Sequence, residues 1–295
     1  RIIKIQKTKI INYLKKGGVP IVAGFQGINS DFRITTLERG GSDTSAILCA
    51  KFFNAEKCII YTDVEGVFTT DPNLTKAAKK IDKISYEEML EMASLGAKVM
   101  QPASIQEARL NRIEVDVRST FSKKLGTTIT KKKNIINKNT IRGISFTKND
   151  AKITLIGVKD KPGVAASIFK PLYENSINVD MVVQNISANS RETDLTFTIR
   201  LEDLIKTKKL LQNNKSIKFE KLIVNKNVSK VSIIGVGMIT TPGVTYRMFK
   251  ALAKKKINIE VISTSEIKIS VLINKKNLKK SVEILHQEFK LNHNL

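Results

Sequence analysis

The sequence is poor in the residues that build disulfide frameworks and metal sites. Its 295 residues include no tryptophan, two histidines and two cysteines. Cys49 and Cys58 lie in apolar segments without metal-site spacing, so we expect reduced, buried thiols, as in a cytoplasmic protein. We expect His286 and His293 to lie on the surface near the polar tail. No side-chain cluster for direct metal binding is predicted.

Long hydrophobic runs are also absent. The longest apolar stretch, Val19 to Phe25, contains a proline and is far shorter than the roughly 20 residues that cross a bilayer. Arg1 to Ile5 lacks the apolar core of a secretory signal. The chain begins without methionine, in an amphipathic helix that no strand precedes, which predicts a processed chain or a fragment. We expect a cytoplasmic protein without a membrane partner.

Acidic residues are scarce beside basic ones, 27 against 51, and the net charge is +24. Such a charge suits a polyanion partner such as nucleic acid. However, the lysines are spread along the whole chain and aromatic residues make up only 6%. The one dense run, Lys131 to Lys133, lies in a predicted linker. We favour a solvated lysine-rich surface without a nucleic-acid partner, and keep a polyanion binder as the alternative.

The N-terminal part alternates helix-forming and strand-forming segments. Ser85 to Glu88 is a capping box ahead of a helix that ends near Gly96, and a polar hairpin-like stretch precedes Thr35. This alternation predicts an α/β layered domain with a largely parallel sheet over residues 1–131. The other expected helices are Lys7 to Lys16, Thr44 to Asn54 and the segment after Pro102, and the expected strands are Val19 to Ala23, Lys57 to Tyr61 and Ile113 to Arg118.

The C-terminal half contains an internal repeat. Lys152 to Val158 matches Lys230 to Val236. The later landmarks keep the same order: Pro162-Gly163 with Pro242-Gly243, Phe169 with Phe249, and Ile177 to Asp180 with Ile257 to Glu260. Each copy reads strand, Pro-Gly turn, helix, strand, which predicts two small α+β domains. We place them at residues 148–225 and 226–295, after a linker and leading strand at 132–147.

One predicted turn carries the chemistry of a ligand site. Arg39 to Asp43 opens a helix with Gly40 and Gly41, which let the backbone approach a ligand closely. N–H groups at a helix start attract anions, and Arg39 offers a planar fork to a carboxylate. Ser42 can donate a hydrogen bond, while Asp43 can hold a metal or orient a lysine. Serine and aspartate are also ordinary N-cap residues, so a plain capped turn is the alternative.

Other segments are weaker candidates. Tyr61 to Pro72 follows a strand, and the carboxyl ends of parallel strands are where α/β sheets bind ligands, although a simple turn is the alternative. Lys98 is a compact charge that suits phosphate, with a solvated lysine as the alternative. Gly235 to Gly237 lacks the third glycine of a dinucleotide motif, and the other repeat has Lys159 where Gly237 stands, so we reject that interpretation.

Together these segments resemble aspartate kinases of the amino-acid-kinase family. The Arg39 to Asp43 string followed by Thr62 to Pro72 is specific to them, and the repeat is similar to the paired ACT domains of lysine- or threonine-sensitive members. The resemblance implies the C-terminal part of an amino-acid-kinase three-layer sandwich, followed by two α+β (ferredoxin-like) ACT domains. It implies phosphorylation of the side-chain carboxylate of L-aspartate to 4-phospho-L-aspartate by ATP with Mg²⁺, the first step towards lysine, threonine and methionine.

The resemblance also implies roles for single residues. Arg39 would bind a carboxylate of aspartate, with Ser42 beside it and Gly40 and Gly41 forming the turn. Asp43 would orient the catalytic lysines and the magnesium. The implied ATP-binding residues are Thr62, Asp63, Phe68, Asn73 and Lys98, of which Lys98 would also neutralise the transferred phosphoryl group.

Lysine and/or threonine would bind to the repeats as effectors. The implied residues are Asp160, Lys161, Pro162, Gly163, Val164, Ala165, Asn178, Val179, Asp180 and Gln184 in the first, and Val244, Thr245, Asn258, Ile259, Thr264, Ser265 and Glu266 in the second. Asp180 or Glu266 would hold an ammonium, and N–H groups after each Pro-Gly turn would hold a carboxylate. The ACT domains would pair between chains in a homo-oligomer.

Three departures from the family weaken the expected activity. Glu38 stands where a glycine is usual, and Asn73 stands where an arginine usually contacts phosphate. The N-terminal Lys-Phe-Gly-Gly-type string, which supplies the principal catalytic lysine, is absent from the sequence. We therefore expect this chain by itself to bind ATP poorly. The alternative function is a non-catalytic amino-acid-binding regulatory subunit, or an inactive fragment.

Overall fold

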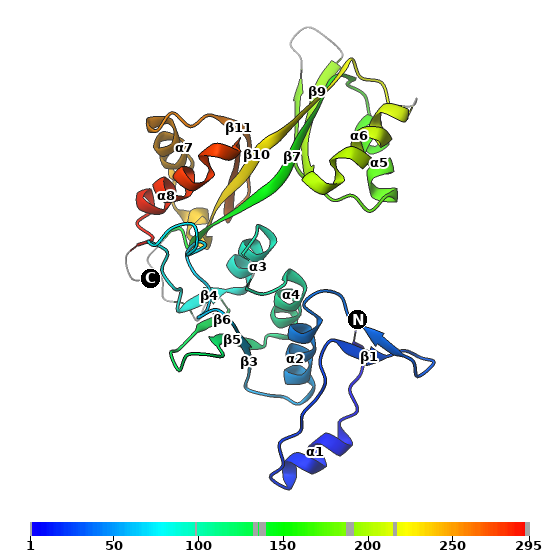
Figure 1. Ribbon diagram of the computed structural model, residues 1–295, viewed down its shortest axis with the longest axis vertical. Coiled ribbons are helices and arrows are strands. Elements are labelled where there is room, and N and C mark those ends of the chain that lie inside the picture. Colours follow the sequence, from blue (N-terminus) through cyan, green and yellow to red (C-terminus); the bar gives the residue numbers. More distant parts are fainter. Residues whose placement is uncertain are drawn as a thin grey trace. The chain divides into compact units, whose positions relative to one another are not determined.

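The computed structural model describes residues 2–97, 99–131, 135, 140–186, 192–214 and 217–292. The chain forms two compact units. The N-terminal unit contains Arg1–Ser145, Ile234–Pro242 and Phe289–Leu295, and the repeat unit contains Phe146–Ile233 and Gly243–Glu288 (Figure 1). Among the described residues, no helix combines the length and apolarity needed to cross a bilayer.

A four-stranded sheet is the centre of the N-terminal unit. Its order is β3-β5-β6-β4, formed by β3 (Lys57–Thr62), β5 (Glu114–Ser119), β6 (Thr127–Thr130) and β4 (Lys83–Ser85). The pairs β3–β5 and β4–β6 are parallel, while β5–β6 is antiparallel. The predicted α/β layering with a largely parallel sheet is therefore confirmed, with one antiparallel pairing in the middle.

Three helices pack on this sheet. They are α2 (Gly41–Phe52), α3 (Tyr86–Ser94) and α4 (Pro102–Asn111), and their buried side chains share one apolar core with the strands. Along β3, Cys58 and Ile60 are buried while their neighbours are exposed, because alternate side chains of a strand point to opposite faces. Only one face of β3 is therefore covered by the described residues.

The predicted start of α3 is confirmed in detail. The Ser85 side chain accepts a hydrogen bond from the Glu88 backbone N–H at 3.2 Å, and the Glu88 carboxylate accepts one from the Ser85 N–H at 3.2 Å. These reciprocal bonds form the capping box read from the sequence. Helix α1 (Thr8–Lys15) lies within its predicted range. Helix α2 begins at Gly41, three residues before the expected Thr44.

The predicted buried strand at Val19 to Ala23 is wrong. None of the three sheets of the described chain includes this segment, and Ile21 is 97% exposed. A strand needs a neighbour that completes its ladder of hydrogen bonds, and hydrophobicity alone does not provide one. The hairpin-like stretch that follows is confirmed, since β1 (Gln26–Ile28) pairs antiparallel with β2 (Ile34–Thr36).

The expected surface position of His286 is also wrong. The side chain is 1% exposed on α8 (Leu278–Glu288), and burial lowers the pKa of its imidazole. His286 follows Val282 by four positions, so helical periodicity places both on the buried face. His293 lies outside the described residues. Both cysteines are free thiols, and burial raises the pKa of Cys58 to about 11.

The repeat unit contains a six-stranded sheet of order β11-β12-β10-β7-β9-β8. The first repeat comprises β7 (Gly143–Lys159), α5 (Val164–Glu174), β8 (Val179–Ile186), β9 (Glu192–Arg200), η2 (Leu201–Asp203) and α6 (Leu204–Asn213). The second comprises β10 (Lys221–Ile234), η3 (Val236–Thr240), α7 (Val244–Lys254), β11 (Ile259–Thr264), β12 (Lys268–Asn274), η4 (Lys275–Asn277) and α8.

The strand order of one repeat is the reverse of that of the other, as in two copies related by an approximate two-fold axis. The first repeat contributes β8-β9-β7 and the second contributes β11-β12-β10, so β7 and β10 are neighbours at the centre. In Figure 1, α5 and α6 accompany the first repeat and α7 and α8 the second. The predicted pair of α+β repeats is confirmed. The division at residue 226 stays a prediction, since it falls within the continuous strand β10.

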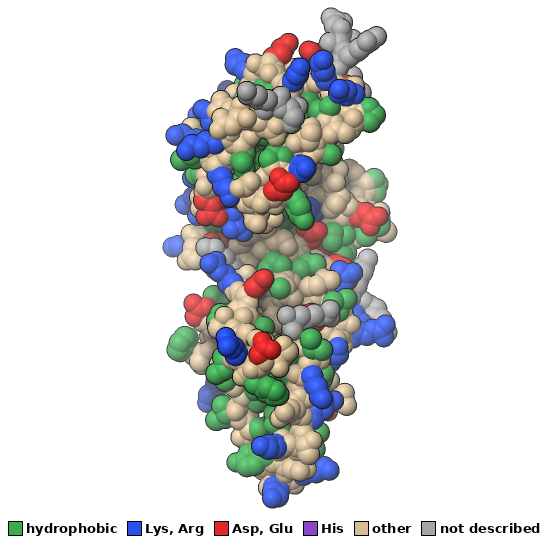
Figure 2. Space-filling view, turned by 90° about the vertical axis from the view of Figure 1, so that its right-hand side faces the viewer, with side chains coloured by type: hydrophobic (Ala, Val, Ile, Leu, Met, Phe, Trp, Pro, Cys, Tyr) green, Lys and Arg blue, Asp and Glu red, His purple; other side chains and the backbone are tan. Residues whose placement is uncertain are grey.

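Basic side chains do not gather into one patch on the face shown in Figure 2. Lys and Arg side chains lie there among acidic and apolar ones. This distribution fits the solvated lysine-rich surface inferred from the sequence.

We expect Gly126→Ala to destabilise the N-terminal unit by about 3 kcal/mol or more, because overpacking against backbone forces strands apart. A Cβ at Gly126 would lie 1.7 Å from the Val117 carbonyl oxygen in β5. Hydrogen exchange of the β5 and β6 amides measures the effect. Gly27→Ala is the matched control, since its Cβ would meet no atom within 4 Å. Equal exchange in the two variants would contradict the prediction.

Candidate functional site

The Arg39 to Asp43 turn forms the start of α2 in the structure. Gly40 is the N-cap, with a left-handed φ of 78° that favours glycine. Its carbonyl accepts a hydrogen bond from the Thr44 N–H at 3.2 Å, which closes the first helical turn. Arg39 and Ser42 are exposed, and Asp43 is half-buried. An exposed guanidinium beside a helix start suits the binding of a carboxylate.

Phe25, from an earlier segment, and the nearby Leu37 pack around this turn. A Cβ on Gly41 would lie 2.6 Å from Leu37 Cβ and 3.0 Å from the Phe25 ring. The Phe25 N–H donates to Ser45 Oγ at 3.3 Å, and its carbonyl accepts from the Leu37 N–H at 2.9 Å. Gly41 is therefore required because no larger side chain fits between these residues and the helix.

Burial affects the Asp43 carboxyl in this turn. Burial raises the pKa of the Asp43 carboxyl, because desolvation disfavours its charged form. A neighbouring ammonium or metal ion would relieve this penalty. The position of Asp43 thus fits the role implied by the family resemblance, orientation of lysines and magnesium.

The loop after α3 lies against the same turn. A Cβ on Gly40 would lie 2.3 Å from Gln101 Cγ, so Gln101 sits directly over this glycine. Lys98, three residues before Gln101, lies outside the described residues, and its catalytic role stays a prediction. The packing of Gln101 nevertheless brings the chain on the C-terminal side of Lys98 to the turn.

The proposed nucleotide residues follow the carboxyl end of β3. The Thr62 carbonyl accepts a hydrogen bond from the Thr120 N–H at 2.8 Å, and Thr62 Oγ1 donates to Asp63 Oδ1 at 3.1 Å. The structure thus brings Thr62 and Asp63 together with Thr120, which follows β5. Farther along the loop, the backbones of Phe68 and Lys80 form an isolated antiparallel β-bridge. The Asn73 N–H donates a hydrogen bond to Asp71 Oδ1 at 2.8 Å.

Sequence reasoning missed the residues after β5. Thr120 joins the end of β3, and Lys124 Nζ lies 3.3 Å from Glu65 Oε1. The sequence pattern could have identified both residues, because both follow the carboxyl end of a strand that is parallel to β3. Within the described part of the chain, His, Cys, Asp and Glu side chains form no cluster of three that could hold a metal ion.

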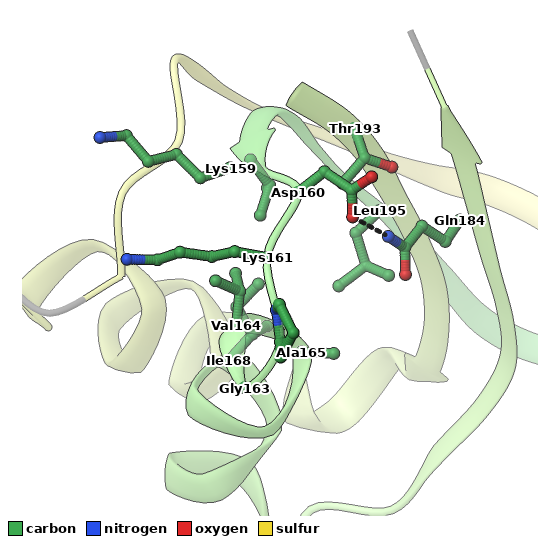
Figure 3. Close-up of a pocket in the computed structure, with 12 residues that line it drawn as sticks. Lys159, Asp160, Lys161, Gly163, Val164, Ala165, Ile168, Gln184, Thr193 and Leu195 are labelled. Atoms are coloured by element: carbon green, nitrogen blue, oxygen red, sulfur yellow. Dashed lines mark hydrogen bonds between the residues drawn. The ribbon is translucent and has the colours of Figure 1, made fainter. Parts of the chain in front are cut away.

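A pocket of about 480 Å³ opens in the first repeat (Figure 3). Seven predicted effector residues line it: Asp160, Lys161, Pro162, Gly163, Val164, Ala165 and Gln184. Gln184 Nε2 donates to Asp160 Oδ1 at 3.5 Å, and these two side chains point toward each other. The side chains of Lys159 and Lys161 extend away from that pair. The pocket thus has one carboxylate next to an amide.

Apolar side chains complete the pocket wall. Val158 and Ile168 are buried, and Leu195 projects from β9 beside Thr193. Sequence reasoning missed these lining residues. Strand periodicity could have found Leu195 and Thr193, because alternate residues of β9 face the same side. The pocket therefore offers an acid and an apolar floor together, a combination that suits an amino acid.

The structure does not bring Asn178, Val179 or Asp180 to this pocket. Lys230 Nζ on β10 donates a hydrogen bond to Asp180 Oδ2, so this carboxylate already has an ammonium partner. Burial alone would raise the pKa of Asp180, but the Lys230 ammonium holds it below its usual range. Asp180 therefore takes part in the contact between the repeats, and its role in effector binding stays a prediction.

The same ion pair occurs a second time with the repeats exchanged. Lys152 matches Lys230 in the repeat, and Glu260 matches Asp180. Lys152 Nζ lies 2.5 Å from Glu260 Oε2, and Asn225 Nδ2 donates to the same carboxylate at 3.2 Å. A small shared apolar cluster accompanies the pairs, formed by Met181, Val228, Val261 and Leu272. Each repeat thus supplies a lysine to the other.

The predicted effector residues of the second repeat fall at three places. Val244 and Thr245 begin α7, and Asn258 and Ile259 stand at the start of β11. Thr264 ends β11, and Ser265 and Glu266 lie in the turn before β12. The Ser265 N–H donates to the Lys268 carbonyl at 2.8 Å in that turn. Their common role as an effector site stays a prediction.

Comparison with known proteins agrees with both parts of the chain. The model of the amino acid kinase family matches residues 1–119, and that of the ACT domain matches residues 153–214 and 231–289. Aspartate kinase of Pseudomonas fluorescens is 46% identical over 293 residues, which are 99% of this chain and 71% of that relative. The chain belongs to the aspartate kinase family.

Solved structures of this family have the same fold. Aspartate kinase of Clostridium acetobutylicum superposes with a TM-score of 0.83 at 26% identity, covering 90% of this chain and 62% of that one. Aspartokinase III of Escherichia coli, in complex with aspartate and ADP, superposes with a TM-score of 0.77 at 29% identity, covering 96% of this chain and 63% of that one. The same protein has also been solved with lysine and aspartate. The expected fold, part of an amino-acid-kinase domain followed by ACT repeats, is confirmed.

Proposed function

We propose that this chain takes part in the ATP-dependent phosphorylation of the side-chain carboxylate of L-aspartate, under control of an amino acid bound to its ACT repeats. The observation that carries the proposal is the Arg39 to Asp43 turn at the start of α2, with Gln101 packed on Gly40. The similar E. coli enzyme was solved with aspartate and ADP, the substrate and nucleotide that this site would take.

In the proposed reaction, the turn binds and orients aspartate. The Arg39 guanidinium clamps a carboxylate, Ser42 donates a hydrogen bond beside it, and the α2 N-terminus adds its positive dipole. Catalysis of phosphoryl transfer is largely positioning and charge neutralisation, so fixed donors at the turn lower the barrier. Lys98 would neutralise the transferred group. The product would be 4-phospho-L-aspartate, the start of lysine, threonine and methionine synthesis.

The nucleotide would lie beyond the ends of β3 and β5. Thr62, Asp63 and Phe68 would contact the adenosine side, and Asn73 would stand near the phosphates. Magnesium would enter with ATP and neutralise phosphate charge, and Asp43 would orient it. Such a chain would act in the cytoplasm, where ATP and aspartate are available.

Lysine and/or threonine would be the effectors. In the first repeat, Asp160 would hold the α-ammonium or a side-chain ammonium, and N–H groups at the start of α5 would hold the carboxylate. The apolar floor at Val158, Ile168 and Leu195 would contact the aliphatic part of the ligand. The similar E. coli enzyme was solved with lysine. We further propose a homo-oligomer paired through the repeats.

Formation of aspartyl phosphate, trapped with hydroxylamine, tests the function. In the full-length gene product we expect a signal that needs aspartate, ATP and Mg²⁺, and expect Arg39→Ala to lower kcat/KM for aspartate by about 100-fold or more, since it removes a bidentate contact. Lys98→Ala should abolish the signal. Arg33→Ala, an exposed arginine on the β1–β2 hairpin, is the control. No product, with amino-acid binding intact, would favour a regulatory subunit.

A further inference from the structure

Glu88 in α3 is a buried carboxylate with partners from three parts of the N-terminal unit. It is 2% exposed. Its Oε2 accepts hydrogen bonds from Ser85 Oγ at 2.9 Å and Ser85 N–H at 3.2 Å. Its Oε1 accepts one from the Val236 N–H at 3.1 Å, immediately after β10. The Arg142 Nε lies 4.0 Å from Oε2, immediately before β7. The capping box alone would need only the Ser85 contacts.

Arg142 depends on this carboxylate. Its side chain is 3% exposed, and its terminal NH2 donates to the Lys83 carbonyl. Burial lowers the pKa of Arg142, while the Glu88 and Asp82 carboxylates oppose that change. A guanidinium stays charged, so burial without a nearby carboxylate would be strongly unfavourable. Glu88 therefore fixes the chain where it enters β7.

The two central strands of the repeat sheet meet at this place. The Arg142 N–H donates to the Ile234 carbonyl at 2.7 Å, which joins the start of β7 to the end of β10. Gly235, next to Glu88's partner Val236, has no room for a side chain, because a Cβ would lie 2.2 Å from the Thr140 carbonyl oxygen. Both strands thus converge, tightly packed, on one carboxylate of α3.

The first residues of β7 make two more contacts with the proposed kinase site. The Ile144 N–H donates to the Thr69 carbonyl at 2.7 Å, within the segment that follows β3. Ser145 Oγ donates to the Met92 carbonyl at 3.3 Å, near the end of α3. The Met92 carbonyl also accepts from the Ala97 N–H at 2.9 Å, in the loop that leads to Gln101. Helix α3 is therefore held near both ends by the start of β7.

We propose that Glu88 is a positioning residue that ties α3, and through it Gln101 over Gly40, to the Arg142 and Val236 segments of the N-terminal unit. Displacement of the Arg142 or Val236 segment must then move α3 or break a buried, charge-assisted set of contacts. The importance of this positioning for catalysis rests on the proposed function, since Gln101 adjoins the proposed substrate turn. The geometry assigns Glu88 no contact with substrate.

Hydrogen exchange of the whole chain tests the assignment without any substrate. In Glu88→Gln, which keeps the shape but loses the charge, we expect at least about tenfold faster exchange in Leu95 to Gln101 and at Val236. Exchange in β3 and β5 of the same unit should stay unchanged. Glu87→Gln removes a half-exposed carboxylate from the same helix, one that pairs with Arg109 on α4 at 3.6 Å, and should alter none of these peptides. Uniformly faster exchange across the unit would overturn the positioning role and indicate general destabilisation.

A double variant separates the ion pair from simple packing. Glu88→Gln leaves the Arg142 guanidinium buried without its carboxylate. Arg142→Met leaves the Glu88 carboxylate buried without its guanidinium. Each change alone should therefore accelerate exchange in the loop. Combined, they leave no uncompensated charge, and we expect exchange slower than in Glu88→Gln alone. Additive acceleration would overturn the coupling. A chain that lacks kinase activity but shows this pattern would refute the proposed function and leave the positioning role standing.

Discussion

Asp180→Asn is expected to destabilise the repeat unit by about 2–4 kcal/mol, although Asp180 itself is half-exposed. The reason is its partner, because the Lys230 side chain is only 5% exposed while that of Asp180 is 54% exposed. Removal of the carboxylate leaves an ammonium buried between β10 and β8 without its counter-charge. The lysine must then lose its proton or move into water, and either outcome opposes folding.

Urea unfolding measures this loss of stability, and hydrogen exchange of the β8 and β10 amides locates it. The double variant Asp180→Asn/Lys230→Met removes the buried charge as well, and we expect it to recover most of the stability. Glu260→Gln, the equivalent change in the other repeat, should have a smaller effect because Lys152 is more exposed than Lys230. Glu202→Gln, an exposed acid of the first repeat, is the control. A double variant as unstable as Asp180→Asn would contradict the explanation.

Asp160→Asn is expected to weaken effector binding by about 10-fold to 100-fold while the fold stays intact. The change keeps the shape of the side chain and removes the one carboxylate lining the pocket. A charge-assisted hydrogen bond to an ammonium contributes about 1.5–3 kcal/mol, and each 1.4 kcal/mol is tenfold in affinity. Gln184 would keep an amide partner at residue 160, so packing of the wall should change little.

Calorimetric titration with L-lysine and L-threonine, singly and together, measures the affinity. Glu174→Gln is the matched control, because it removes the same charge from an exposed position at the end of α5 in the same repeat. Equal weakening in both variants would indicate a general electrostatic effect of this basic chain rather than a contact in the pocket. Absence of binding of either amino acid to the unaltered chain would contradict the effector assignment.

Several features of the fold were predictable because their causes are local. The capping box at Ser85 and Glu88 needs only residues three positions apart, and it forms as expected. The Pro162-Gly163 turn recurs at Pro242-Gly243 with left-handed glycines before α5 and α7. Spacing within one turn or helix is visible in a sequence, and such elements were located correctly.

Other features depended on neighbours that spacing does not reveal. Val19 to Ala23 has the composition of a strand, but no described strand lies beside it to complete a ladder. His286 has a polar side chain near the tail, but packing of α8 leaves it only 1% exposed. Asp180 accepts a hydrogen bond from Lys230, a contact that the sequence did not reveal. In each case tertiary packing decided the outcome.

The sequence by itself determined the family, the order of the elements and the two-fold repeat, because each is written in strings and periodicities of a few residues. Only the tertiary structure decided which charges meet. Lys152 and Glu260 are separated by 108 positions, and Glu88 and Val236 by 148. The physical reason is that a charge is stabilised by whatever lies a few ångströms away in space, and the packing of strands and helices sets that neighbourhood.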